Sequence, residues 1–165
     1  MIIAIDPGSE ESGYVILDED LRPQEFGKIT NDELLGVIGA VDANNQTYSK
    51  GEVHMAIEMV ACYGMPVGKE VFDTCVWIGR FWEAAWSMKK TKIYRKDEKI
   101  NLCQSMKAND ANITQALVDR FATGQKNHGK GTKKDPSYFF GFKKDIWQAY
   151  AVGVTYHDLY IKKDK

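Results

Sequence analysis

Two kinds of hydrophobic pattern alternate along the chain, and together they predict a mixed α/β fold. Residues 1–6 (MIIAID) and 13–17 (GYVIL) are short apolar runs bounded by Pro, Gly, Ser and Glu, which is typical of buried strands. Residues 25–29, 54–58 (HMAIE) and 92–95 predict three further strands. Because short turns separate the first three strands, we expect an antiparallel meander whose first strand is buried.

Helical periodicity occupies the longer stretches between and after these strands. Thr30 or Asn31 is placed to cap a first helix, which a loop at 42–51 is expected to follow. A long helix at 67–88 is predicted to bury one apolar face. That face consists of Val71, Phe72, Cys75, Ile78, Trp82 and Ala85.

Three more helices are expected at 98–105, 110–121 and 143–161. Between the last two, residues 123–137 hold three Gly, one Pro and four Lys, which indicates a mobile basic loop. The order of elements predicts an α/β fold, namely a five-stranded mixed sheet with helices on both faces, in a single domain over residues 1–165.

Length and composition narrow the class of protein. With 165 residues, 44% of them hydrophobic, the chain suits one well-buried domain and is too short for two ordinary ones. The cysteines Cys62, Cys75 and Cys103 are odd in number and lack metal-ligand spacing, which favours a reducing compartment. No signal-peptide pattern opens the chain and no apolar stretch is long enough for a membrane span. We therefore expect a cytoplasmic protein with no membrane partner.

The net charge of −1 hides a strong asymmetry. Residues 1–88 carry 5 basic and 15 acidic side chains, a net of −10, whereas residues 89–165 carry 17 and 8, a net of +9. Clustered Lys and Arg are typical of nucleic-acid binding, because they release counterions from phosphates. A solvated surface whose charges happen to segregate explains the asymmetry equally well.

Three carboxylates stand at exceptional positions: Asp6 ends the first strand, Glu58 ends the fourth, and Asp145 opens the last helix. Each has an ordinary explanation, since Asp6 suits a Pro-Gly turn, Glu58 could pair with a lysine, and Asp145 complements a helix dipole. In the expected topology, however, the ends of the first and fourth strands and the start of the last helix lie close together, so the three acids are expected to meet. An ionised carboxylate in an apolar strand needs a compensating charge, and an all-oxygen ligand set favours Mg²⁺ or Mn²⁺.

Three segments carry a resemblance to a known family. IIAIDPGSEESGY, HMAIE and DIWQAYAVGVTYH resemble, in order and over nearly the whole chain, the motifs of RuvC-type Holliday-junction resolvases, most nearly the small phage-encoded ones. The resemblance implies a ribonuclease-H-like fold and a homodimer that acts on four-way or branched DNA in a bacterial or phage-infected cell. It also implies two Mg²⁺ per active site, with Mn²⁺ as a substitute, and makes Asp6, Glu58 and Asp145 catalytic metal ligands that direct paired phosphodiester hydrolysis.

Two departures from the family pattern stand out. Gln148 occupies the place of a fourth acid, three residues after Asp145, where its carbonyl remains a candidate metal ligand of lower charge. In KANDANI, Asp110 stands where the family carries a functional lysine. DNA contacts are expected from the basic second half and from one aromatic residue that could stack on a base. These candidates are Tyr63, Lys89, Arg95, Lys99, Lys107, Lys133, Lys134, Lys143 and Lys144.

Other functions stay open. A strand-turn-strand with Asp-Pro-Gly also fits the actin-like sugar kinases and ATPases, in which such a turn binds phosphate. Those proteins need a second domain to close over the nucleotide, for which this chain is too short, so no nucleotide cofactor is expected. A nuclease of broader specificity, acting on forks and flaps, remains possible. So does a junction-binding protein with weak cleavage, which Gln148 favours.

Overall fold

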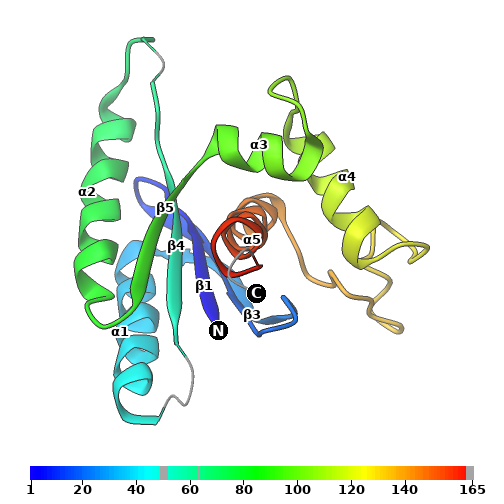
Figure 1. Ribbon diagram of the computed structural model, residues 1–165, viewed down its shortest axis with the longest axis horizontal. Helices are drawn as coiled ribbons and strands as arrows, with labels where there is room; N and C mark the ends of the chain where they lie inside the picture. Colours follow the sequence, from blue (N-terminus) through cyan, green and yellow to red (C-terminus); the bar gives the residue numbers. More distant parts are fainter. Residues whose placement is uncertain (49–51, 63, 163–165) are drawn as a thin grey trace.

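The computed structural model describes residues 1–48, 52–62 and 64–162, and its centre is a five-stranded mixed sheet (Figure 1). The strands are β1 (Ile2–Asp6), β2 (Glu11–Leu17), β3 (Pro23–Thr30), β4 (His54–Met59) and β5 (Lys89–Tyr94), in the spatial order β3-β2-β1-β4-β5. β1, β2 and β3 pair antiparallel, whereas β4 and β5 run parallel to β1. The predicted meander and its buried first strand are confirmed.

Helices cover both faces of this sheet. α1 (Asn31–Tyr48) and α2 (Lys69–Ala84) pack on one face, and α5 (Lys144–Tyr156) packs on the other. α3 (Arg95–Cys103) and α4 (Asp110–Phe121) lie outside α5 on that second side (Figure 1). Strand alternation creates the two cores, because Ile3 and Ile5 point toward α1 and α2, whereas Ala4 points toward α5.

α1 continues through most of the stretch for which a loop at 42–51 was predicted, so that prediction was wrong up to Tyr48. The helix is extended by tertiary contacts: the buried Asp42 carboxylate accepts hydrogen bonds from the Ser87 backbone and hydroxyl, both at 2.9 Å. Asn45 donates to the same Ser87. At the other end Thr30 is the cap: its hydroxyl accepts a hydrogen bond from the Glu33 backbone, and the Glu33 carboxylate accepts hydrogen bonds from the Thr30 hydroxyl and backbone.

α2 is shorter than the predicted 67–88, and its buried face differs from the expected one. Thr74, Ile78 and Phe81 face the core, followed by Ala85 just beyond the helix. Phe72, predicted to be buried, is 60% exposed. α2 carries apolar residues on two sides, so periodicity alone did not identify the side that meets the sheet.

α5 is buried along nearly its whole length and approaches the sheet closely. A Cβ on Gly153 would lie 2.6 Å from the Leu17 side chain and 3.0 Å from that of Ala4. The helix continues into η1 (His157–Ile161), a single π-helical segment, so the predicted helix at 143–161 is confirmed with a change of winding near its end.

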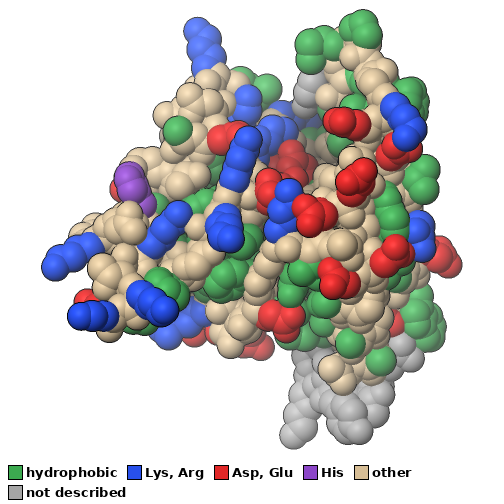
Figure 2. Space-filling model, turned by 180° about the vertical axis from the view of Figure 1, so that it is seen from behind, with side chains coloured by type: hydrophobic (Ala, Val, Ile, Leu, Met, Phe, Trp, Pro, Cys, Tyr) green, Lys and Arg blue, Asp and Glu red, His purple; other side chains and the backbone are tan. Residues whose placement is uncertain are grey.

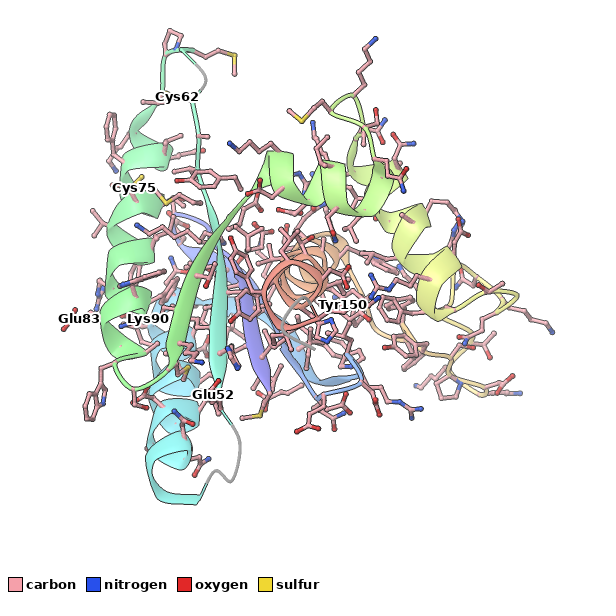
Figure 3. All side chains as sticks on the ribbon, in the orientation of Figure 1. Glu52, Cys62, Cys75, Glu83, Lys90 and Tyr150 are labelled. Atoms are coloured by element: carbon pink, nitrogen blue, oxygen red, sulfur yellow. The ribbon has the colours of Figure 1, made fainter. Side chains whose placement is uncertain are left out.

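An aromatic cluster joins α5 to the segment that precedes it. The Phe139 ring lies 4.5 Å from that of Trp147 and 5.3 Å from that of Tyr150, a residue of α5 labelled in Figure 3. Residues 123–137 form hydrogen-bonded turns, including a bridge between Gly131 and Pro136. Their mobility stays a prediction. None of the described helices is long and apolar enough to cross a bilayer.

Candidate metal centre

Asp6 and Glu58 meet because they end neighbouring parallel strands. β1 and β4 pair with Ile5 opposite Ile57, so the next residue of each strand is an acid at the same edge of the sheet. Alternation turns both acids toward α5, on the side where Ala4 and Ala56 contribute to the core. The two carboxyl groups lie close enough for each to influence the pKa of the other.

Asp145 joins this pair because α5 begins directly over β2. Gly13, the β2 partner of Asp6, lies under the first turn of the helix. A Cβ on Gly13 would be only 2.5 Å from the main-chain oxygen of Asp145, so only glycine permits this approach. The Asp145 charge then acts on Asp6 across the gap.

The turn after Asp6 is held by buried polar side chains. Ser12 accepts a hydrogen bond from the Gly8 backbone at 3.1 Å and donates to Asn31 at 2.6 Å. Asn31 in turn donates to the Gly8 carbonyl at 3.0 Å. Because Ser12 and Asn31 are both almost fully buried, they fix the course of the chain at the carboxyl end of β1.

The negative charges of these carboxylates repel one another. Burial, followed by repulsion from Glu58 and Asp145, raises the pKa of Asp6 to about 8. Burial also raises the pKa of Glu58, against the opposing effect of Arg95. A bound cation would relieve both effects, because it stabilises the ionised form of each carboxylate.

A fourth acid, Glu98 of α3, lies beside this pair and is fully buried. Arg95 donates to one Glu98 oxygen at 2.6 Å and also pairs with Asp110, while the other Glu98 oxygen has no partner among the described residues. Burial and the nearby Glu58 raise the pKa of Glu98 to about 9. Arg95, predicted to contact DNA, is thus placed as a counterion within the acid cluster.

Asp145 already has a cationic partner. The Lys28 ammonium lies 3.1 Å from an Asp145 oxygen and 3.4 Å from an oxygen of Glu11. These groups, together with Asp6 and the turn that follows it, line a polar cavity of about 400 Å³. The cavity is large enough for hydrated cations and part of a phosphate group.

The donor set fits a hard divalent cation: carboxylate oxygens, partly buried, whose mutual repulsion a cation would offset. In the described part of the chain, no three acidic, His or Cys side chains are already arranged to hold one ion. The Lys28 contact gives a reason, since it turns one Asp145 oxygen toward an ammonium group. Binding would therefore require Asp145 to exchange its partner.

Gln148 lies one turn after Asp145 and is buried, with a side-chain oxygen that has no hydrogen-bond partner among the described residues. It lines a second cavity of about 390 Å³, next to Asp110 and Lys144. An unpartnered buried oxygen is costly in free energy, so this site is chemically prepared for a cation or a water molecule. Its role as a metal ligand stays a prediction.

The predicted DNA-contacting residues fall into separate groups. Lys143 and Lys144 are exposed immediately before Asp145, and Lys133 and Lys134 are exposed on the loop before them. Lys107 is exposed after α3, whereas Lys99 on α3 is half-buried. Tyr63 lies outside the described residues.

Lys89 lies away from the acids. It begins β5 and pairs with Glu52 at 2.7 Å, before the start of β4, whereas the acids lie where β1 and β4 end. Figure 3 shows this separation, because Glu52 and Cys62 mark the two ends of β4.

Sequence reasoning missed Lys28, Glu11 and Glu98. Glu98 had a detectable signal, since it lies three residues after Arg95 on a helix and so can pair with it. Lys28 and Glu11 had none, because their position depends on the register of β2 against β3.

No protein-family model matches the chain, and no curated protein matches it in sequence. Solved structures do match. The structure titled "T. thermophilus RuvC in complex with Holliday junction substrate" gives a TM-score of 0.65 at 15% identity, over 98% of this chain and 94% of that one. A Thermus thermophilus RuvC structure gives 0.64 at 16% identity, over 99% and 96%. The predicted closeness to small phage-encoded proteins is not tested by these matches. At such low identity they establish the fold, and the chain has the ribonuclease-H-like fold of RuvC.

Proposed function

We propose that this protein is a divalent-metal-dependent endonuclease that resolves four-way DNA junctions. The observation that carries the proposal is the meeting of Asp6, Glu58 and Asp145 at one edge of a ribonuclease-H-like sheet. These acids come from β1, β4 and α5, which are distant in the sequence and adjacent in space. An oxygen-only acid cluster of this kind suits phosphodiester hydrolysis by bound metal.

The three acids would act together as metal ligands. Asp6, on which the charges of Glu58 and Asp145 both act, would hold the metal together with these two acids. The divalent cations held there would activate the attacking water and stabilise the leaving oxygen. Arg95, which pairs with Glu98, opposes the rise in the pKa of Glu58.

The DNA surface is the basic part of the molecule. Figure 2 shows Lys and Arg gathered on the side of α4 and the loop that follows it, next to a group of acids in the centre of that face. Lys143 and Lys144 connect the two regions, because they immediately precede Asp145. A phosphate backbone lying on the basic side would therefore pass over the acids.

A homodimer would supply the second cut. The outer face of α2 exposes Phe72 and Val76 at 60% and 62%, and beyond it Trp86 at 68%. Large apolar side chains gathered on one exposed face are typical of an interface. We assign this face to a second copy of the chain, which would present two acid clusters to opposed strands.

The second candidate is a junction-binding protein with weak cleavage. Gln148 favours it, because an amide in place of a carboxylate lowers the negative charge available to a second ion. A nuclease of broader specificity would share the same acids and differ in dimer geometry.

Incubation with labelled four-way, forked and linear DNA, in Mg²⁺, Mn²⁺ or EDTA, tests these functions. We expect paired nicks near the branch point that Asp6→Asn abolishes while junction binding survives. Asp20→Asn, at an exposed aspartate of the β2–β3 turn, is the matched control and should cut normally. Cleavage by Asp6→Asn would refute the site, binding without cleavage in both metals would favour the second candidate, and equal cutting of forks would indicate broader specificity.

A further inference from the structure

Lys28 reaches Asp145 because of a row of residues across three strands. Asp6 of β1 pairs with Gly13 of β2, which pairs with Lys28 of β3. Directly opposed residues of antiparallel strands project to the same face of a sheet. Since Gly13 has no side chain, nothing in the middle of the row separates Lys28 from the acids, and its ammonium reaches Asp145 at 3.1 Å.

The Lys28 ammonium occupies an Asp145 carboxylate oxygen that the proposed metal would need. Side chains of Lys28 and Asp145 are 46% and 35% exposed, so water reaches the pair and the pair can exchange. Lys28 also has a second partner, Glu11, at 3.4 Å. If Asp145 were taken by another cation, the ammonium could remain paired with Glu11 and stay in the cavity.

We propose that Lys28 is a built-in competitor for the divalent cation at Asp145: it neutralises this carboxylate in the metal-free protein and shifts to Glu11 when a cation binds. The inference rests on the proposed function, because it assumes that Asp145 is a metal ligand. Its consequence is a higher metal concentration for half-saturation than the acids alone would require.

Calorimetric titration of Mn²⁺ into the DNA-free protein tests this, with metal affinity rather than cleavage as the readout. Lys28→Met keeps the length of the side chain and removes its charge, so Mn²⁺ should bind about two- to fivefold more tightly, as expected for an exposed ion pair. Lys28→Arg keeps the charge and should bind Mn²⁺ with nearly the wild-type affinity.

Lys89→Met is the matched control. It also removes a lysine from an exposed ion pair, Lys89 with Glu52 at 2.7 Å, but at the opposite end of the sheet. Tighter binding by Lys28→Met alone supports the proposal. Equal tightening by Lys89→Met would show a general effect of net charge and overturn it, as would wild-type or weaker affinity in Lys28→Met.

Asp6→Asn separates failure of this inference from failure of the proposed function. If Asp6→Asn loses Mn²⁺ binding while Lys28→Met behaves as wild type, the metal site stands and only the competition is refuted. If Asp6→Asn binds Mn²⁺ normally, the metal site is misplaced and both proposals fall.

Discussion

Asp6 is the acid of the proposed metal-ligand set on which both other acids act. It is enclosed at the end of a central strand, with Glu58 and Asp145 both acting on it, and its pKa rises to about 8. The metal-free folded chain therefore retains a proton on Asp6 over a pH range in which the unfolded chain, with a pKa near 3.8, has lost it. Stability must then fall as pH rises through this range.

The first prediction concerns this pH dependence. In EDTA, the melting temperature of the wild type should fall between pH 5 and pH 9, and Asp6→Asn should reduce the fall because an amide does not ionise. At pH 9 we expect Asp6→Asn to melt roughly 3–8 °C above the wild type, with a smaller difference at pH 5. Thermal unfolding followed by circular dichroism measures both slopes. A parallel pair of curves would contradict the electrostatic account, and Mg²⁺ should flatten the wild-type curve.

Gln148 provides a second prediction for a single residue. Its buried oxygen has no partner among the described residues, and a carboxylate there would add a negative charge one helical turn from Asp145. We expect Gln148→Asp to lower the Mg²⁺ concentration for half-maximal cleavage roughly tenfold, the effect of about 1.4 kcal/mol. Gln24→Asp adds the same charge on exposed β3 and should leave this concentration unchanged. No change in Gln148→Asp would place residue 148 outside the metal cage.

At the level of secondary-structure elements, the centre depends on how closely α5 approaches the sheet. Gly13 and Gly153 are both in positions where a Cβ would collide with a neighbour, at 2.5 Å from the Asp145 main chain and 2.6 Å from Leu17. Gly13 lies in β2 under the first turn of α5, and Gly153 lies in α5 itself toward its other end, so together they set the height of the helix over β1 and β2. The position of Asp145 is therefore a property of the packing of a whole helix.

The third prediction follows from this packing. Gly13→Ala should lower the free energy of unfolding by about 1–3 kcal/mol, because α5 must move outward to make room for the methyl group. Gly36→Ala is the control: at this exposed position of α1 nothing lies within 4 Å of the added Cβ, so the substitution should raise stability by about 0.5–1 kcal/mol. Urea denaturation measures both changes. A Gly13→Ala protein as stable as the wild type would show that the close approach is dispensable.

At the level of the whole molecule, the basic loop before α5 and the exposed Phe72 and Val76 of α2 lie on opposite sides of the sheet. α5 and the basic segments lie on one side of the sheet, whereas α2 lies on the other with an exposed apolar face (Figure 1). In the proposed function, the acid cluster would meet DNA on one side while the far side would meet another copy of the chain. The proposed homodimer uses both sides of one molecule for different partners.

The fourth prediction tests the α2 face. Phe72→Glu should weaken dimerisation roughly thirtyfold or more, since a central aromatic residue of an interface contributes about 2 kcal/mol or more. Size-exclusion chromatography with light scattering should detect two copies in the wild type and one in the variant. Ile100→Glu places the same charge on α3, where the isoleucine is 50% exposed, and should remain dimeric. A dimeric Phe72→Glu protein would assign the interface elsewhere.

The sequence by itself determined the sheet and the place of its acids, for a local physical reason. Apolar runs that end in Asp6 and Glu58 specify strands, and parallel neighbours end at the same edge, so the pair follows from pattern and topology. The start of α4 at Asp110 was also predicted from the helical pattern, and in the structure the Asn109 side chain caps it.

Only the tertiary structure decided which charges surround these acids and which helix faces are buried. The Lys28 contact with Asp145 depends on strand register and on the missing side chain of Gly13, and the burial of Glu98 depends on how α3 packs against the strands and α5. Which of the two apolar sides of α2 is buried depends on which one packs against the sheet. Long-range contacts decide such features, because residues distant in the chain carry no local record of one another.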